Sequence, residues 1–196
     1  MAFFGLVIYA GYRAIDLFLP AWANAFASQH SDMKRAIASY AKLDEVLARL
    51  GKDYHASRSI LFRFHDASRD ASQMAFYFVT MANAVGVAID QEKLKDLPAS
   101  TFVSVLPTLV KGGIYFSWTK DMPDSPLKEL QVSRGTRAVL YAPMPDLDHN
   151  LIGILSLEWL SESDVSVITD EMKADLTAKA TLISGYFSLP QLKDIP

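Results

Sequence analysis

Two apolar runs around a short polar segment, VLYAPMPDLDHNLIGILSLEW (residues 139–159), constrain the fold more than any other part of the chain. Both runs are apolar on both faces, which is typical of strands at the centre of a covered sheet. The intervening MPDLDHN has the length and composition of a hairpin loop. We therefore predict that Val139–Pro143 and Leu151–Trp159 form an antiparallel hairpin at the sheet centre.

The loop itself is rich in polar side chains that also occur in active sites. Asp146, Asp148, His149 and Asn150 lie within five positions of one another. Asp and Asn bond their own backbone in turns, and Pro fixes φ, so a turn needs these residue types on its own account. The spacing does not match a calcium-binding loop. We interpret the segment as a turn and not as an active-site loop.

Other segments with strand patterns indicate an antiparallel sheet. RSILFRFH (58–65) alternates apolar and polar residues as a half-buried strand does, and MAFYFVTM (74–81) is its expected hairpin partner. GIYFSW (113–118) is a third strand. TKDMPDSPLKEL (119–130) is expected to be a loop that could contain one helical turn.

Two further helices are expected. One begins near Ser100 and ends at Gly112, and Pro107 inside it implies a kink or a later start. The other follows Ser161–Asp164, which resembles a capping box. Its apolar stripe consists of Ile168, Met172, Leu176, Ala180, Ile183 and Phe187. Helices combined with an antiparallel sheet define an α+β domain.

Residues 1–27 are the most apolar part of the chain and are long enough to cross a membrane. Arg13 and Asp16 near the centre would each cost about 2.5–3.5 kcal/mol in a bilayer, although they can pair at i, i+3. The segment either spans a membrane or is buried against protein, and both interpretations stay open. The expected membrane or assembly contacts are Phe3, Phe4, Leu6, Val7, Ile8, Leu17, Phe18, Leu19 and Trp22.

So large an apolar segment normally marks an interface. We therefore expect the chain to be membrane-associated or part of a larger assembly, with itself or another protein as its partner through the N-terminal helices. If the segment spans, Lys34 and Arg35 follow it, and the positive-inside rule makes the remainder cytoplasmic.

A heptad-like pattern follows the apolar segment. It consists of Met33, Ala36, Tyr40, Leu43, Leu47, Leu50 and Tyr54. A coiled coil and an amphipathic helix lying on its own domain explain it equally well. The expected organisation is a hydrophobic helix (1–27), an amphipathic linker helix (28–52), a globular domain (53–188) and a tail (189–196).

Composition excludes several classes of function. The formal net charge is −3 without a run of like charges, so nucleic-acid binding by a basic face is not expected. These 196 residues contain no cysteine, which removes disulfides, thiolate nucleophiles and cysteine zinc sites. No nucleophile elbow, P-loop or dinucleotide fingerprint occurs, and the four histidines lack metal-ligand spacing. We predict no enzyme, no catalytic residues, no metal and no cofactor.

Residues Asp53 to Phe187 resemble a GAF-type domain. The likeness rests on ILFRF, SVLPTLVKGG, SRGTRAVLYAPMPDLDHNLIGILSLEW and the SESD before the last helix. It implies a GAF/PAS-like antiparallel sheet of five or six strands with packing helices, binding of small molecules or partners, and dimerisation through flanking helices. The cyclic-nucleotide signature is not visible, and no cysteine is present to hold a bilin. The implied pocket lies between the sheet and its covering loops, with Tyr115, Trp118 and Asp121 as candidate lining residues.

A narrower likeness links APMPDLDHNLIGILSLEW to the soluble domain of the lysis holins of T-even-type phages. It implies a phage membrane-lysis protein whose soluble domain is regulatory. The favoured hypothesis is a non-enzymatic GAF-like sensory or protein-interaction module, held in an oligomer, a larger assembly or a membrane by its N-terminal helix. The holin-type protein is the alternative.

Overall fold

The computed structural model describes residues 41–66 and 77–187. The apolar helix expected over 1–27, with its nine contact residues, lies outside this range. So do the 189–196 tail and the heptad positions Met33, Ala36 and Tyr40. Within the described ranges, none of the helices combines the length and the hydrophobicity that a membrane crossing requires.

Six strands form one sheet in the order β3-β2-β1-β6-β5-β4, and every neighbouring pair is antiparallel. The predicted hairpin is present, because β5 and β6 are paired antiparallel strands. The other edge of β6 pairs with β1, so the hairpin lies in the middle of the sheet. The hairpin predicted between the first two strands is also present. The strands are β1 Arg58–Asp66, β2 Tyr77–Gly86, β3 Leu97–Pro98, β4 Tyr115–Trp118, β5 Ala138–Pro145 and β6 Leu151–Trp159.

The polar loop between β5 and β6 is a turn organised by Asp146. Its Oδ1 accepts hydrogen bonds from the backbone N–H groups of Asp148 (2.9 Å) and Asn150 (2.8 Å), and its Oδ2 accepts one from the Asn150 side chain. The Asn150 side chain is the main cause that lowers the pKa of Asp146 below its ordinary value. His149 adopts a left-handed φ of 64° within the turn. These side chains therefore shape the chain reversal, as the turn interpretation predicts.

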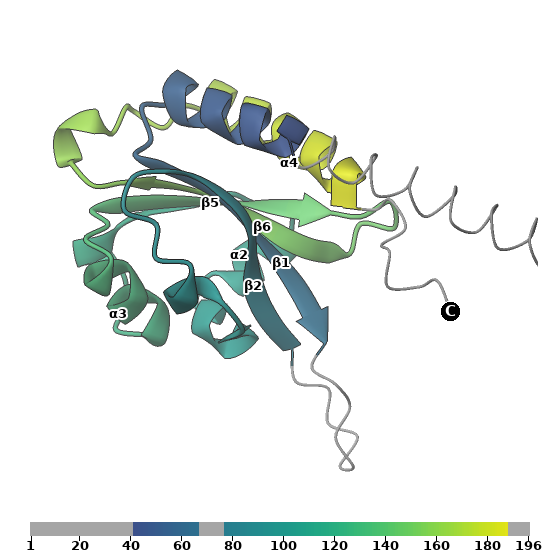
Figure 1. Cartoon of the computed structure of the whole chain (residues 1–196), viewed down its shortest axis with the longest axis horizontal. Coiled ribbons are helices and arrows are strands. Elements are labelled where there is room, and N and C mark those ends of the chain that lie inside the picture. Colours follow the sequence, from purple (N-terminus) through teal and green to yellow (C-terminus); the bar gives the residue numbers. More distant parts are fainter. Residues whose placement is uncertain (1–40, 67–76, 188–196) are drawn as a thin grey trace, which may run out of the picture. The chain divides into compact units, whose positions relative to one another are not determined.

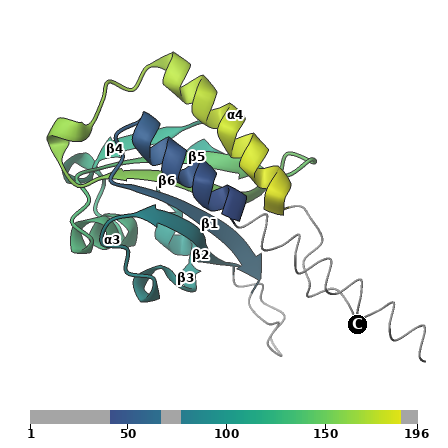
Figure 2. The ribbon, with the colours of Figure 1, turned by 45° about the horizontal axis from the view of Figure 1, so that its top comes forward.

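Two helices cover one face of the sheet. The helix over residues 41–53 and α4 (Asp170–Phe187) lie side by side across it, drawn in blue and yellow in Figures 1 and 2. Leu43, Leu47 and Leu50 are buried in the core that these helices share with the strands. At these positions the heptad pattern thus faces its own domain. Residues 41–52 belong to the same compact unit as the sheet.

Short helical segments cover the opposite face, where α2 and α3 are visible in Figure 1. The second core lies between them and the sheet, with Phe62, Phe102 and Tyr141 near its centre. Phe102 makes edge-to-face ring contacts with both other rings, at centroid distances of 5.5 and 6.0 Å. The covering segments are η1 Glu92–Leu94, η2 Ala99–Phe102, α2 Leu106–Val110, η3 Thr119–Asp121 and α3 Pro126–Ser133.

Two helices differ in extent from the sequence-based expectation. The segment 119–130 was expected to contain at most one helical turn, but the eight-residue helix α3 begins within it. Ser125 Oγ caps this helix by accepting a hydrogen bond from Lys128 N, and Pro126 suits the first helical position. The last helix begins only at Asp170, since Thr169 Oγ1 accepts from Met172 N, whereas Ser161 caps the separate short segment η4 (Glu162–Asp164). The architecture is α+β, as predicted.

Candidate functional site

The structure places the three residues predicted to line a pocket in different surroundings. Tyr115 packs on the α3 side of the sheet, where its ring stacks on that of Tyr141 at 6.3 Å. Trp118 packs on the other side with Phe116, and Lys120 Nζ lies 5.7 Å from its ring centroid. Asp121 is exposed. The three side chains do not converge, and of them only Tyr115 borders the polar cluster described next.

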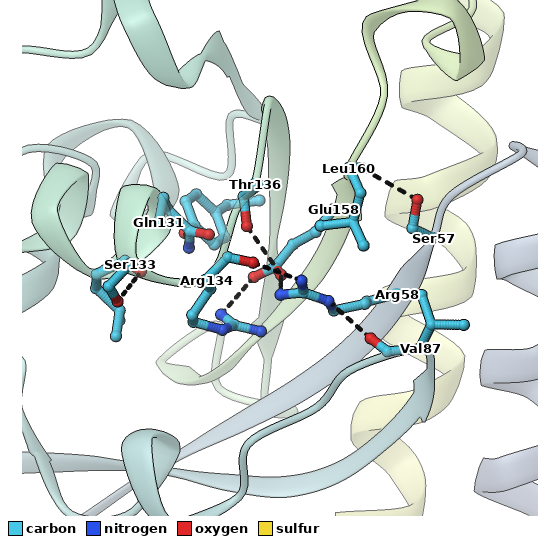
Figure 3. A network of polar contacts seen from close by, with 11 residues as sticks. Ser57, Arg58, Val87, Gln131, Ser133, Arg134, Thr136, Glu158 and Leu160 are labelled. Carbon is cyan, nitrogen blue, oxygen red and sulfur yellow. Dashed lines mark hydrogen bonds and ion pairs between the residues drawn. The ribbon is translucent and has the colours of Figure 1, made fainter.

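A buried carboxylate, Glu158 on β6, is the centre of a polar cluster beneath α3 (Figure 3). Its Oε1 accepts from Arg134 Nη1 at 2.8 Å, and its Oε2 accepts from Arg58 Nη1 at 3.1 Å. The Thr136 hydroxyl donates to Oε2 at 3.5 Å. Glu158 has an exposed fraction of 0%, so both ion pairs are fully shielded from solvent.

Arg58 uses all three of its guanidinium nitrogens. In addition to Glu158, its Nη2 donates to the carbonyl of Arg134 at 2.7 Å, and its Nε donates to the carbonyl of Val87 at 3.0 Å. Burial is the main cause that lowers the pKa of Arg58 from its ordinary value, while the Glu158 carboxylate acts in the opposite direction. Arg58 therefore joins β1, the segment after β2 and the end of α3, and each of its guanidinium nitrogens already donates within the protein.

Arg134 differs from Arg58 because one side of its guanidinium is unused. Nη1 holds Glu158, whereas Nε and Nη2 are buried without a hydrogen-bond partner. The arginine side chain has an exposed fraction of 2%. Nε–H and Nη2–H point in the same direction and form the fork that binds a planar two-oxygen group. Arg134 thus presents a complete bidentate donor edge inside the protein.

Neutral polar groups continue the cluster toward Tyr141. Gln131 Nε2 donates to the Tyr141 hydroxyl at 2.7 Å, and Gln131 Oε1 is buried without a partner. Ser156, the β6 neighbour of Tyr141 in register, also has a buried hydroxyl without a partner. Burial raises the pKa of the Tyr141 phenol well above its ordinary value, and the Glu158 carboxylate adds to this effect. Tyr141 therefore stays neutral and acts only through hydrogen bonds.

The cluster carries an excess of positive charge. Two arginines share one carboxylate, and within the described residues no second acid pairs with either of them. An uncompensated charge is costly in a buried position. Two surface hollows of about 210 and 270 Å³ share no lining residue with the cluster. The cluster is thus buried, carries net charge and retains unused donors and acceptors.

Strand periodicity explains why these residues meet. Ser156 and Glu158 point to the same face of β6, because alternate residues of a strand share a face. Arg58 lies opposite Glu158 in the β1–β6 register, and Arg134 reaches the carboxylate from the end of α3, where Gly135 turns the chain with a φ of 70°. This cluster was not among the sites predicted from the sequence. The available signal was Glu158 inside a strand that is otherwise apolar except for Ser156, since a buried acid requires a partner.

No grouping of three or more metal-binding side chains occurs within the described residues. Comparison with known proteins gives no match to a family model and none to a curated protein. Solved structures do match. The GAF domain region of a Geobacter sulfurreducens protein superposes with a TM-score of 0.62 at 16% identity, covering 82% of this chain and 99% of that one.

Two further structures have a similar fold. The blue-light-absorbing form of the PixJ GAF domain from Thermosynechococcus elongatus gives a TM-score of 0.57 at 18% identity, covering 79% of this chain and 85% of that one. A methionine-R-sulfoxide reductase from Thermoplasma acidophilum gives a TM-score of 0.58 at 12% identity. The match covers 78% of this chain and 94% of the reductase chain.

The chain therefore has the GAF fold, which confirms the resemblance predicted from the sequence. The structures named here do not show the likeness to holins. PixJ is a cyanobacteriochrome receptor, whereas the Thermoplasma protein is a reductase, so the shared fold alone does not specify a function.

Proposed function

We propose that this protein is a non-enzymatic sensory module that binds a small polar molecule between α3 and the sheet. The observation that carries the proposal is the buried cluster, in which Arg134, Gln131 and Ser156 all have polar atoms without a partner. Most buried polar groups in native proteins are paired, so several unpaired atoms in one place favour a binding site over simple packing. A small molecule with matching donors and acceptors would satisfy them together.

The side chains of the cluster favour binding over catalysis. Glu158 is held by two arginines, and Tyr141 keeps its proton because burial raises its pKa. Tyr141 is therefore not suited to proton transfer near neutral pH, and both carboxylate oxygens of Glu158 are already occupied by the arginines. The absence of cysteine from these 196 residues also removes chemistry that needs a thiolate or a disulfide.

One group outside the cluster has the residue types of a nucleophile with a base, but its geometry is unsuitable. His65 Nε2 lies 2.8 Å from the Thr80 hydroxyl, which donates to Asp96 at 2.9 Å. The same Nε2 lies 3.3 Å from Asp96, whereas a catalytic triad needs the acid on the opposite ring nitrogen. The hydroxyl proton is thus directed to the acid and away from the base, which supports a structural role.

A sensory role requires contact between the binding site and an element that can report its state. Trp159, the residue after Glu158, points to the opposite face of β6, and its Nε1 donates to the carbonyl of Tyr54 at 3.1 Å. Tyr54 directly follows the helix over 41–53. Ser57 and Leu160 add a second hydrogen bond (3.1 Å) at the same place. Adjacent residues of β6 therefore contact the cluster and the end of the flanking helix.

A thermal-shift screen of small polar metabolites on the full-length chain tests this function. A ligand that binds the native state raises the melting temperature. We expect the rise caused by a true ligand to disappear in Gln131→Leu, which removes the buried amide, and to persist in Ser133→Ala on the exposed side of α3. If no compound acts through Gln131 or Arg134, the proposed ligand site is wrong.

We further propose that residues 1–27 hold this domain in an oligomer, a larger assembly or a membrane. The length of their apolar run supports this role. In the sequence, the segment precedes the helix over 41–53. This helix and α4 line a hollow that contains Val46, Leu50 and the exposed Leu182. If residues 1–27 span a membrane, we expect the domain to be cytoplasmic.

Light scattering on the full-length chain and on a chain lacking residues 1–27 measures the effect of this segment on assembly. We expect the full-length chain to form oligomers or to require detergent, and the shortened chain to be smaller and folded. A monodisperse full-length monomer without detergent would contradict the assembly role. It would leave the ligand site unaffected.

A further inference from the structure

We infer that the molecule bound at this site is a small, singly charged anion with two coplanar oxygen atoms, held on the Nε–Nη2 edge of Arg134. This inference rests on the proposed function and specifies its ligand class. A carboxylate and a planar inorganic oxyanion share the required chemistry. The charge of the cluster, its geometry and the contrast between Arg58 and Arg134 each point to this ligand class.

The charge balance of the cluster requires an anion. Arg58 and Arg134 contribute two positive charges and Glu158 one negative charge, so one positive charge remains in a buried position. A water molecule could satisfy the free N–H groups but would leave this charge uncompensated. A monoanion would satisfy the N–H groups and cancel the charge, whereas a dianion would leave one negative charge in excess.

The geometry selects the kind of anion. The unused Nε–H and Nη2–H of Arg134 are parallel donors, and two oxygen atoms in one plane accept from both at once. Lysine would supply the same charge as a point without this fork. The site therefore distinguishes a two-oxygen planar group from a spherical anion such as chloride.

The two arginines have different roles, which assigns the anion to one of them. Every nitrogen of Arg58 already donates to Glu158 or to a backbone carbonyl. Glu158 in turn occupies Nη1 of Arg134 and leaves only the Nε–Nη2 edge available. Glu158 thus positions Arg134, and the edge that remains is the binding group.

Calorimetric and NMR titration of the full-length chain tests the inference, with sodium acetate and sodium nitrate as probes in a chloride background of constant ionic strength. Acetamide, which has nearly the shape of acetate without its charge, is the matched neutral probe. We expect acetate or nitrate to bind and to shift the Nε–H resonance of Arg134, and acetamide to do neither. We expect sulfate to bind more weakly than the monoanion.

Variants separate the bidentate edge from general charge effects. Arg134→Lys keeps the charge but removes the fork, so anion affinity should fall by about tenfold or more. Arg137→Lys is the matched control, because Arg137 is exposed and lies three positions further along the chain. If Arg134→Lys does not fold, the comparison of acetate with acetamide on the unmodified chain still tests whether the ligand must be an anion.

Three results would overturn the inference in distinguishable ways. Binding of acetamide or another neutral compound that depends on Gln131 but not on Arg134 would refute the anion and leave the proposed ligand-binding function intact. Absence of binding by anions and neutral compounds alike would refute both. Equal anion binding by Arg134→Lys and the unmodified chain would show that the bidentate edge is not the binding group.

Discussion

Replacing Glu158 by glutamine is expected to lower the free energy of unfolding by about 3–5 kcal/mol, the usual cost of removing one partner of a buried ion pair. The substitution keeps the shape of the side chain but leaves Arg58 and Arg134 with two buried positive charges and no acid. Urea unfolding followed by circular dichroism measures the change, provided that the slope with denaturant stays constant.

Glu162→Gln is the control for this substitution, because Glu162 lies four positions away and is exposed. Its only ion pair in the described structure is a long surface contact with Lys120 at 3.9 Å, which is worth little. Equal, small effects of both substitutions would show that the arginines are compensated by another group, and the charge argument for the ligand would then fail.

Replacing Leu47 by alanine is expected to lower the free energy of unfolding by about 2–5 kcal/mol, the range for truncating a buried leucine. Leu47 is fully buried between the helix over 41–53 and the sheet. The measurement is again denaturant unfolding. Because this helix shares the core, the tryptophan fluorescence, to which the core residue Trp159 contributes, and the helical signal should change in one transition.

Leu182→Ala serves as the comparison, since this leucine of α4 is 60% exposed. Its truncation should change the free energy of unfolding far less than Leu47→Ala does. If Leu47→Ala has no larger effect than Leu182→Ala, the helix over 41–53 does not contribute to the stability of the domain. The Tyr54–Trp159 hydrogen bond would then be of no use for transmitting a signal.

The parts of the fold that were predicted correctly depend on local patterns. The two apolar runs around Asp146–Asn150 specify strands and a turn through neighbouring residues alone, and the structure pairs them at the sheet centre. The start of α4 was misplaced because two hydroxyl side chains, Ser161 and Thr169, can each cap a helix. Only the packing of Met172 and Leu176 on the sheet selects the second.

The candidate site required information that local patterns do not contain. Arg58 and Glu158 are separated by 100 positions, and they meet only because β1 and β6 are neighbours. The pocket predicted from Tyr115 and Trp118 neglected strand parity: residues three apart on a strand point to opposite faces. Once residues 113–118 are predicted to be a strand, the sequence alone shows that Tyr115 and Trp118 lie on opposite faces.

The sharing of one carboxylate by two arginines also has a consequence for evolution. A substitution at Glu158 that is harmless in one homologue must be accompanied by changes at Arg58, at Arg134 or at both, because either arginine alone would otherwise be left charged and buried. We expect these three positions to covary in a deep alignment, as residues in spatial contact do. Homologues that replace Arg134 while retaining Arg58 and Glu158 would keep a neutral pair and lose the anion, so this one position should divide the lineage into anion binders and non-binders.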